Sequence, residues 1–286
     1  MVPSFATMKR LRRALIVVGI LAILAYVGGV VWLITQETRI VFEAEPTLGK
    51  LRPAAPFEEV RVDRGQDPRQ LLWVLRAATD PASRPWVLYL HGNDANIASR
   101  LNILHAEKLR ALGLNVLVAE YRGFGGMDGT PTEAGLEIDG RSAYDYLRRE
   151  LHAEPQRIIV YGWSLGSAVA VDLVSHVDEA ATILEGAPAS LVAIGARRYP
   201  YFPIRLLIRN PFESIRKIDK AGSPILFLHS PEDAIIPFAE GRMLYDAAPS
   251  PKQFVEVSGG HVYASERDPR FFPAIRAFLR AHRLLQ

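Results

Sequence analysis

The chain has 286 residues, of which 49% are hydrophobic, and a formal net charge of +3. Four of its 34 basic residues lie within residues 1–36, which contain no acidic residue, so the remaining 30 basic residues face 31 acidic ones. The basic character belongs to the N-terminal tail, and the absence of a basic-aromatic stripe elsewhere argues against a nucleic-acid partner. This length suits a single α/β domain with one sizeable core.

An uncharged apolar run from Ala14 to Ile34 follows the basic tail. As a helix, its ~21 residues would be roughly 31 Å long, which matches the hydrocarbon thickness of a bilayer. A cleaved signal peptide is the alternative, but the run is longer than a usual signal-peptide core and no clear A-x-A cleavage site follows it. We expect a tail over residues 1–13, a single transmembrane helix over 14–34 and a linker over 35–56.

Basic residues are distributed unevenly about this run. Only Arg39 lies close after it, whereas four precede it: Lys9, Arg10, Arg12 and Arg13. This asymmetry predicts a cytoplasmic N-terminus, with the rest of the chain on the opposite side of the membrane. That side is periplasmic or extracellular in a bacterium, and luminal or extracellular in a eukaryote. The chain has no cysteine, which is compatible with an oxidising compartment without requiring one.

Strand-like and helix-like stretches alternate from residue 57 to the C-terminus. The expected strands are residues 58–62, 70–75, 85–92, 115–123, 157–162, 181–186, 224–230 and 253–259. The expected helices are residues 97–112, 132–151, 167–177, 191–208, 239–247 and 271–285. The first two strands resemble an antiparallel pair. Continuously apolar strands that alternate with helices predict a mostly parallel sheet with helices on both faces, and ligands bind at the carboxyl ends of such strands.

Ser164 lies at one of these strand ends, in the segment VYGWSLGSA. A sharp turn between a strand and a helix exposes a serine hydroxyl, and Gly162 and Gly166 leave room for that turn. The backbone N–H of Leu165, at the start of the helix, is placed to stabilise an oxyanion. The alternative interpretation is a tight glycine-rich turn that contains an incidental serine.

A nucleophilic serine needs a base, and His261 is the candidate. It follows the last expected strand on a glycine-flanked loop, after every candidate acid, which gives the chain order serine, acid, histidine. His91 and His229 end strands and are expected to be structural. The other four histidines fall on helices or helix ends, where surface or packing roles are expected: His105, His152, His176 and His282.

The acid that would orient this histidine is less sharply defined by the sequence. Glu232 and Asp233 both follow the strand at 224–230, where a carboxylate would fix the imidazole tautomer and stabilise its cation. Asp233 lies deeper in the loop, but this separates the two residues only weakly. Glu185, after the preceding strand, is a rival, and a salt bridge or helix cap is the alternative role for each carboxylate.

The segment YLHGNDAN supplies a second candidate oxyanion donor. Gly92 allows the chain to turn, so the N–H of Asn93 can point toward Ser164. Asn93 and Asp94 would otherwise cap the following helix. We expect no metal and no cofactor, because the sequence has no cysteine, no H-E-x-x-H motif and no ligand-spaced histidine pair with a carboxylate.

The chain resembles the α/β-hydrolase superfamily in six blocks that occur in the right order: LYLHGNDANI, EYRGFGGMDGTPTEAGL, VYGWSLGSAVAVDL, EGAPASL, LHSPEDAIIPFAEGRML and GGHVYA. More narrowly, it is similar to the single-pass, membrane-anchored group, which includes lysophospholipid and monoacylglycerol hydrolases and protein depalmitoylases. The resemblance covers about residues 38–286. It implies an α/β-hydrolase fold after the transmembrane helix, with these site residues: Ser164 as nucleophile, Asp233 rather than Glu232 as acid, His261 as base, and Asn93 and Leu165 as oxyanion donors.

The function expected from these residues is a membrane-anchored serine hydrolase of carboxylic or thio esters that acts through an acyl-enzyme intermediate. The insert over residues 191–218 mixes aromatic and aliphatic residues with arginines. It would form an acyl-chain groove beside a membrane, which predicts a lipid ester as substrate, or simply a helix packed on the sheet. A peptidase using the same residues, or a membrane-tethered binding protein without turnover, is the alternative function.

Overall fold

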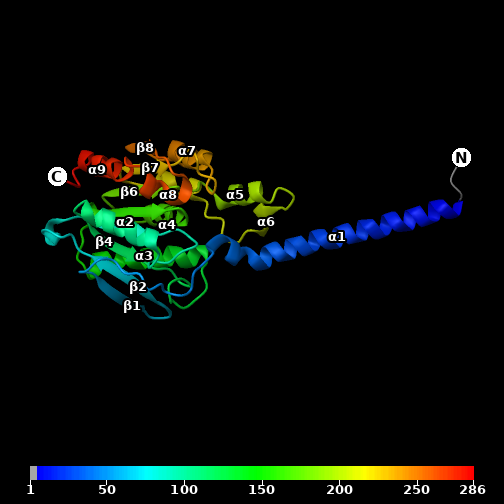
Figure 1. The fold of residues 1–286 in the computed structure, drawn as a ribbon, viewed down its shortest axis with the longest axis horizontal. Helices are drawn as coiled ribbons and strands as arrows, with labels where there is room; N and C mark the ends of the chain where they lie inside the picture. The colour runs from blue at the N-terminus through cyan, green and yellow to red at the C-terminus, as the bar shows by residue number, and fades with distance from the viewer. Residues whose placement is uncertain (1–4) are drawn as a thin grey trace.

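In the computed structural model, which describes residues 5–286, one long helix, α1 (Phe5–Phe42), extends away from the rest of the chain (Figure 1). Among the described residues, it is the one helix long and apolar enough to cross a membrane. Its apolar side chains are exposed on all sides over most of its length. The predicted linker at 35–56 is therefore wrong for residues 35–42, which continue the helix. Phe42 is fully buried and packs edge-to-face on Phe212, so contact with the body stabilises these last turns.

Residues 43–56 have no regular structure, yet they are tied to the body by backbone hydrogen bonds. The N–H groups of Gly125 and Gly126 donate to the carbonyls of Glu45 and Pro46. The side-chain amide of Asn96 donates to the carbonyl of Thr47 at 2.8 Å. This segment therefore lies fixed along the surface of the domain.

The body is built on one eight-stranded sheet in the order β1-β2-β4-β3-β5-β6-β7-β8. The strands are β1 (Glu58–Arg64), β2 (Asp67–Leu75), β3 (Trp86–Leu90), β4 (Asn115–Ala119), β5 (Ile158–Trp163), β6 (Ala181–Glu185), β7 (Ile225–His229) and β8 (Lys252–Glu256). β1 pairs antiparallel with β2 and β2 pairs antiparallel with β4, whereas β3 to β8 are parallel. The expected antiparallel opening pair and the mostly parallel sheet are confirmed.

Side chains alternate between the two faces of this sheet, as the two-residue period of a strand requires. On β3, Leu88 and Leu90 join a core beneath α3 (Glu133–Arg149), α4 (Leu165–Val174) and α7 (Phe238–Ala247). Val87 and Tyr89 join the core on the opposite face, beneath α2 (Arg100–Ala111), α8 (Gly260–Arg267) and α9 (Phe271–Ala281). Because both faces are covered, nearly every residue of β3 to β7 is buried.

The insert after β6 differs from the single helix predicted over 191–208. It forms two helices, α5 (Leu191–Arg198) and α6 (Ile204–Leu207), which lie beside the C-terminal part of α1 (Figure 1). Pro200 and Pro203 lie between them, and proline has no N–H for a helix interior and clashes with the preceding turn. Within residues 5–286, four short 3₁₀ helices complete the fold: Pro81–Ser83, Pro155–Arg157, Ser214–Arg216 and Ile218–Lys220.

Candidate active site

Ser164 occupies a strained turn between β5 and α4. Its backbone has φ +54° and ψ −120°, a region that residues with a side chain rarely adopt. The turn requires the glycines that lie two residues before and two residues after Ser164. A Cβ at Gly162 would lie 2.5 Å from the Cα of Ser167, and one at Gly166 would lie 2.5 Å from the carbonyl oxygen of His91. Both glycines are therefore required by contact with backbone.

The structure brings Ser164, His261 and Asp233 into one hydrogen-bonded chain. His261 Nδ1 lies 2.6 Å from Asp233 Oδ2, and His261 Nε2 lies 2.7 Å from Ser164 Oγ. A carboxylate can only accept, so Nδ1 carries the imidazole proton and Nε2 accepts from the serine hydroxyl. Ser164 directly follows β5, Asp233 lies in the loop after β7, and His261 lies at the start of α8 after β8, so the three side chains meet at the carboxyl edge of the sheet.

Asp233 is held as an ionised acceptor. Its Oδ1 accepts the backbone N–H groups of Ile235 at 2.9 Å and Ile236 at 2.8 Å. Burial raises the pKa of Asp233, but hydrogen bonds from His229 and His261 and the N–H of Ile236 outweigh that effect and hold the pKa well below its usual range. The carboxylate therefore stays charged, as stabilisation of an imidazolium requires.

The two rival acids have other partners. Glu232 points elsewhere and its Oε2 lies 3.4 Å from the N–H of Gly259. Glu185 is buried and accepts from His105 Nε2 at 3.0 Å and from the Tyr161 hydroxyl at 2.6 Å. The geometry thus selects Asp233 as the acid beside the imidazole. Within residues 5–286, no three His, Asp or Glu side chains are grouped so as to hold a metal ion.

His261 was predicted on a glycine-flanked loop, but it lies in the first turn of α8. Gly259 and Gly260 precede it with φ values of +105° and +70°, and these positive angles turn the chain from β8 back toward the sheet edge. Gly186, after β6, lies beneath the imidazole: a Cβ there would lie 3.1 Å from His261 Nδ1. The ring is therefore packed between backbone and its two hydrogen-bond partners.

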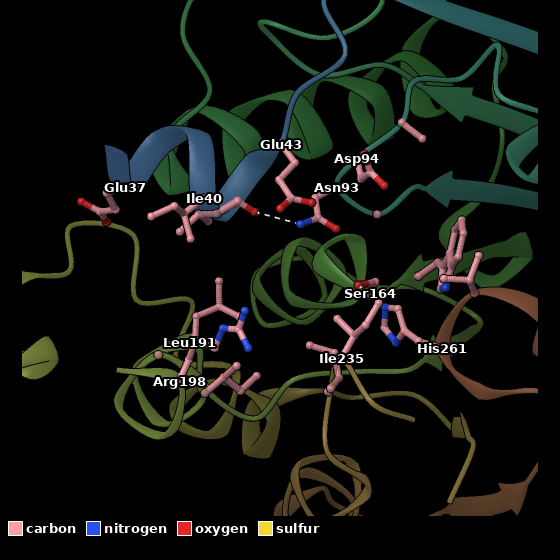
Figure 2. A pocket seen from close by; sticks show the side chains of 18 of the residues that line it. Glu37, Ile40, Glu43, Asn93, Asp94, Ser164, Leu191, Arg198, Ile235 and His261 are labelled. Carbon is pink, nitrogen blue, oxygen red and sulfur yellow. Dashed lines mark hydrogen bonds between the residues drawn. The ribbon is translucent and has the colours of Figure 1, made fainter. Parts of the chain in front are cut away.

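The two backbone N–H groups predicted to bind an oxyanion belong to Leu165, which directly follows Ser164, and to Asn93, which follows Gly92. Leu165 begins α4, and Gly92 approaches so closely that a Cβ on it would lie 3.1 Å from the Cβ of Ser164. Neither the Leu165 nor the Asn93 N–H has an acceptor among the hydrogen bonds of residues 5–286. The Asn93 side chain instead donates to the Val41 carbonyl at 3.1 Å (Figure 2).

The predicted alternative role of Asn93 and Asp94 as helix caps is wrong. Ser99 caps α2, since its side chain accepts the N–H of Asn102. Asp94 has φ +59°, and its N–H points to the carbonyl of Phe42 at 3.3 Å. The loop after β3 is thus shaped by its contact with the end of α1.

A cavity of about 720 Å³ opens beside Ser164 and His261 (Figure 2). Its aliphatic side chains come mainly from three regions: Leu33, Ile40 and Val41 of α1; Leu191, Ile194, Ile204 and Leu207 of α5 and α6; and Ile235 and Ile236 after β7. The loop after β3 and the start of α8 complete the lining, and charged side chains lie among the apolar ones: Glu37, Glu43, Asp94, Arg100 and Arg198. At one edge, burial and the neighbouring charge of Asp94 raise the pKa of Glu43. The contribution of α1 is absent from the sequence prediction, although the apolar residues Ile40 to Phe42 were a signal for it.

No family model matches the chain. It is 36% identical over 272 residues to a protein of Mycobacterium tuberculosis described as uncharacterized, a match that covers 93% of this chain and 95% of that one. It is 28% identical over 272 residues to the Arabidopsis thaliana alpha/beta hydrolase domain-containing protein WAV2, with coverage of 83% and 88%. An esterase from Pyrococcus furiosus superposes with a TM-score of 0.71 at 18% identity, covering 84% and 97%, and shares the fold. The chain belongs to the α/β-hydrolase superfamily.

Proposed function

We propose that the protein is a serine hydrolase of carboxylic or thio esters. The observation that carries the proposal is the continuous hydrogen-bond chain from Ser164 through His261 to Asp233 at the carboxyl edge of the sheet. A hydroxyl whose proton is already shared with a neutral imidazole is an activated nucleophile. The supporting comparison is that a solved structure of the same fold is an esterase.

The reaction follows from these positions. Ser164 Oγ attacks the ester carbonyl while His261 Nε2 takes its proton, and Asp233 stabilises the resulting imidazolium. The N–H groups of Asn93 and Leu165 bind the oxyanion of the tetrahedral intermediate. The imidazolium then gives its proton to the leaving alcohol or thiol, which leaves an acyl group on Ser164. Water activated by the same imidazole releases the acid and restores the serine.

The aliphatic lining of the cavity favours an ester with an apolar acyl group over a polar peptide. A volume of about 720 Å³ is large enough for a ligand of drug or lipid-chain size. Aliphatic walls gain about 25 cal/mol for each Å² of apolar surface that the substrate buries. The acyl chain would therefore lie among the aliphatic side chains of α1, α5 and α6, with its carbonyl at Ser164.

We also propose that α1 anchors the enzyme in a membrane with its N-terminus on the cytoplasmic side. The apolar residues Ala14 to Ile34 are free of charge, and the basic residues Lys9 to Arg13 precede them. Anchoring would explain why so many large apolar side chains of α1 are exposed in the structure. A tagged N-terminus that is protected from protease in intact cells, with a digestible C-terminus, would support this orientation.

The function is tested with the purified full-length chain in detergent micelles. A fluorophosphonate probe and p-nitrophenyl butyrate report the nucleophile and the turnover. The Ser164→Ala variant should lose labelling and at least about 10³-fold in kcat, as expected when a nucleophile of this kind is removed. Ser175→Ala, at the far end of the same helix, is the matched control and should retain both. Folded wild-type protein that neither labels nor turns over ester would instead indicate a binding protein.

A further inference from the structure

The hairpin of α5 and α6 packs directly on the part of α1 that is expected to span the membrane (Figure 1). The ring of Phe202, between the two helices, stacks on Tyr26 with centroids 5.4 Å apart and planes 9° apart. The same ring covers Gly29 so closely that a Cβ there would lie 2.8 Å from it. Glycine at position 29 is therefore what allows the hairpin to lie against the helix.

These contacts fix how deep the hairpin lies along α1. Tyr26 lies eight residues before Ile34, the last residue of the uncharged run. At 1.5 Å per residue, this is about 12 Å along the helix axis. If residues 14–34 cross the hydrocarbon layer, the tip of the hairpin is level with that layer and not with the aqueous phase.

A salt bridge fixes the base of the hairpin to the same helix. Glu37 Oε2 accepts from Arg209 Nε at 2.7 Å, and its Oε1 accepts from the N–H of Asn210 at 2.9 Å. Glu37 is itself buried by these partners. The hairpin is thus attached to α1 at both its tip and its base, so helix and hairpin act as one unit.

The hairpin exposes large apolar side chains. Tyr201 and Leu206 are each 85% exposed, more than any other large apolar side chain of residues 5–286. Two exposed arginines accompany them, Arg197 and Arg205. A third, Arg198, instead lines the cavity (Figure 2). Apolar side chains with flanking arginines are the composition of segments that lie in a membrane interface, where the long arginine side chains reach the phosphates.

The inner surface of the same hairpin lines the cavity beside Ser164. Ile194 of α5 and Ile204 and Leu207 of α6 line it together with Leu33 and Ile40 of α1. The two elements that are apolar enough to contact lipid are therefore also the two that form the aliphatic walls of the cavity.

We propose that residues 191–208 are a second membrane-binding element, seated beside α1 in the leaflet next to the hydrolase domain. Tyr201, Phe202 and Leu206 lie in the acyl-chain region or its interface, and the arginines bind lipid phosphates. The cavity then opens between α1 and the hairpin toward the bilayer, so that an ester substrate enters from the leaflet. This inference rests on the membrane anchoring proposed above.

Whether the hairpin lies in the membrane is measured by fluorescence quenching, without an enzyme assay. Because the chain contains no cysteine, Tyr201→Cys can be labelled at a single site with an NBD fluorophore. In phosphatidylcholine vesicles, spin-labelled lipids should quench this probe strongly. The control is Ile138→Cys on α3, which is 46% exposed and should be quenched little. Equal quenching at the two sites overturns the proposal. Blue-shifted but unquenched emission at position 201 also overturns it, because it shows that protein covers the hairpin.

Entry of the ester substrate from the leaflet into the cavity is tested with a matched pair of charged variants. Leu206→Asp should lower hydrolysis of a long-chain p-nitrophenyl ester embedded in vesicles at least fivefold, while hydrolysis of soluble p-nitrophenyl butyrate stays within twofold. Ile138→Asp should change neither rate. Equal effects of Leu206→Asp on the two substrates overturn leaflet entry. If the wild type hydrolyses neither ester, the proposed function fails, whereas the quenching experiment still decides whether the hairpin lies in the membrane.

Discussion

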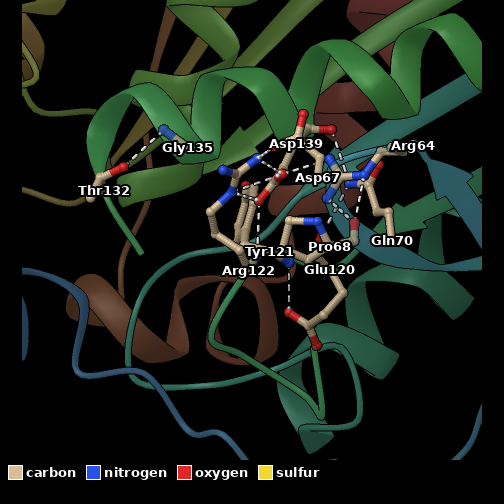
Figure 3. Close-up of polar contacts among 10 residues, drawn as sticks. All are labelled: Arg64, Asp67, Pro68, Gln70, Glu120, Tyr121, Arg122, Thr132, Gly135 and Asp139. Atoms are coloured by element: carbon tan, nitrogen blue, oxygen red, sulfur yellow. Dashed lines mark hydrogen bonds and ion pairs between the residues drawn. The ribbon is translucent and has the colours of Figure 1, made fainter. Parts of the chain in front are cut away.

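Replacement of Asp139 by alanine should destabilise the protein strongly. Asp139 lies on α3 with a side chain that is completely buried (Figure 3). It accepts from Arg64 Nη1 at 2.7 Å, from Arg122 Nη2 at 2.7 Å and from the backbone N–H of Arg122 at 2.8 Å. This one carboxylate joins α3 to the β1–β2 hairpin and to the loop after β4.

The expected loss in the free energy of unfolding follows from the burial of the two arginines that pair with Asp139. The side chains of Arg64 and Arg122 are only 7% and 13% exposed, so removal of the carboxylate leaves two poorly hydrated guanidinium groups. Breaking a buried ion pair in this way costs about 3–5 kcal/mol. In the variant, Arg122 still has its ion pair with Asp67 at 3.2 Å, so the loss in the free energy of unfolding stays within that range. For a chain of this size, the melting temperature should fall by about 6–20 °C.

The assay is urea denaturation of the full-length chain in detergent micelles, followed by tryptophan fluorescence. Asp145→Ala on the same helix is the matched control, because Asp145 pairs with Arg141 and Arg149, which are 51% and 76% exposed. Exposed pairs of this kind contribute about 0–1 kcal/mol. A loss below about 1 kcal/mol for Asp139→Ala, or equal losses for the two variants, would refute this account of the buried cluster.

Two further substitutions test the turn and a pH effect. Gly166→Ala places a Cβ 2.5 Å from the His91 carbonyl oxygen and should lower the free energy of unfolding by about 3 kcal/mol in the same denaturation assay. Gly222→Ala is the control: a Cβ there has no atom within 4 Å, so it should change the free energy of unfolding by less than about 1 kcal/mol. Burial raises the pKa of Glu179 to about 6, against hydrogen bonds from Thr182 and Ser223 that lower it. The fold therefore loses stability as the pH rises from about 4.5 to about 6, and the loss is complete above that range. Glu179→Gln should accordingly be more stable than wild type by about 1–2 kcal/mol at pH 8 but not below about pH 4.5. A difference that is the same at both pH values would contradict this assignment.

Much of the fold could be predicted from the sequence because local signals and tertiary packing agree. Continuously apolar strands such as 86–90 are buried on both faces, which only a covered parallel sheet allows. The glycines at 162 and 166 predicted the turn at Ser164, and contacts with backbone explain both. His261 was identified by its order in the chain. Its place at the start of α8 was missed because the two glycines before it look like loop residues.

The choice between Glu232 and Asp233 could not be made from composition or spacing. It depends on the turn after β7, where two backbone N–H groups hold one oxygen of Asp233 and leave the other for His261. The wall that α1 adds to the cavity was also missed. It depends on contacts such as Glu37 with Arg209, which are 172 residues apart in the chain and have no local signature.

The central claim is that Ser164 carries the acyl group during ester hydrolysis. The most direct test is to quench the full-length protein during turnover of p-nitrophenyl butyrate and to locate the butyryl group by peptide mass spectrometry. A butyryl group is expected on Ser164, and none on the Ser164→Ala protein. A butyryl group on a different residue, or undiminished turnover by Ser164→Ala, would contradict it.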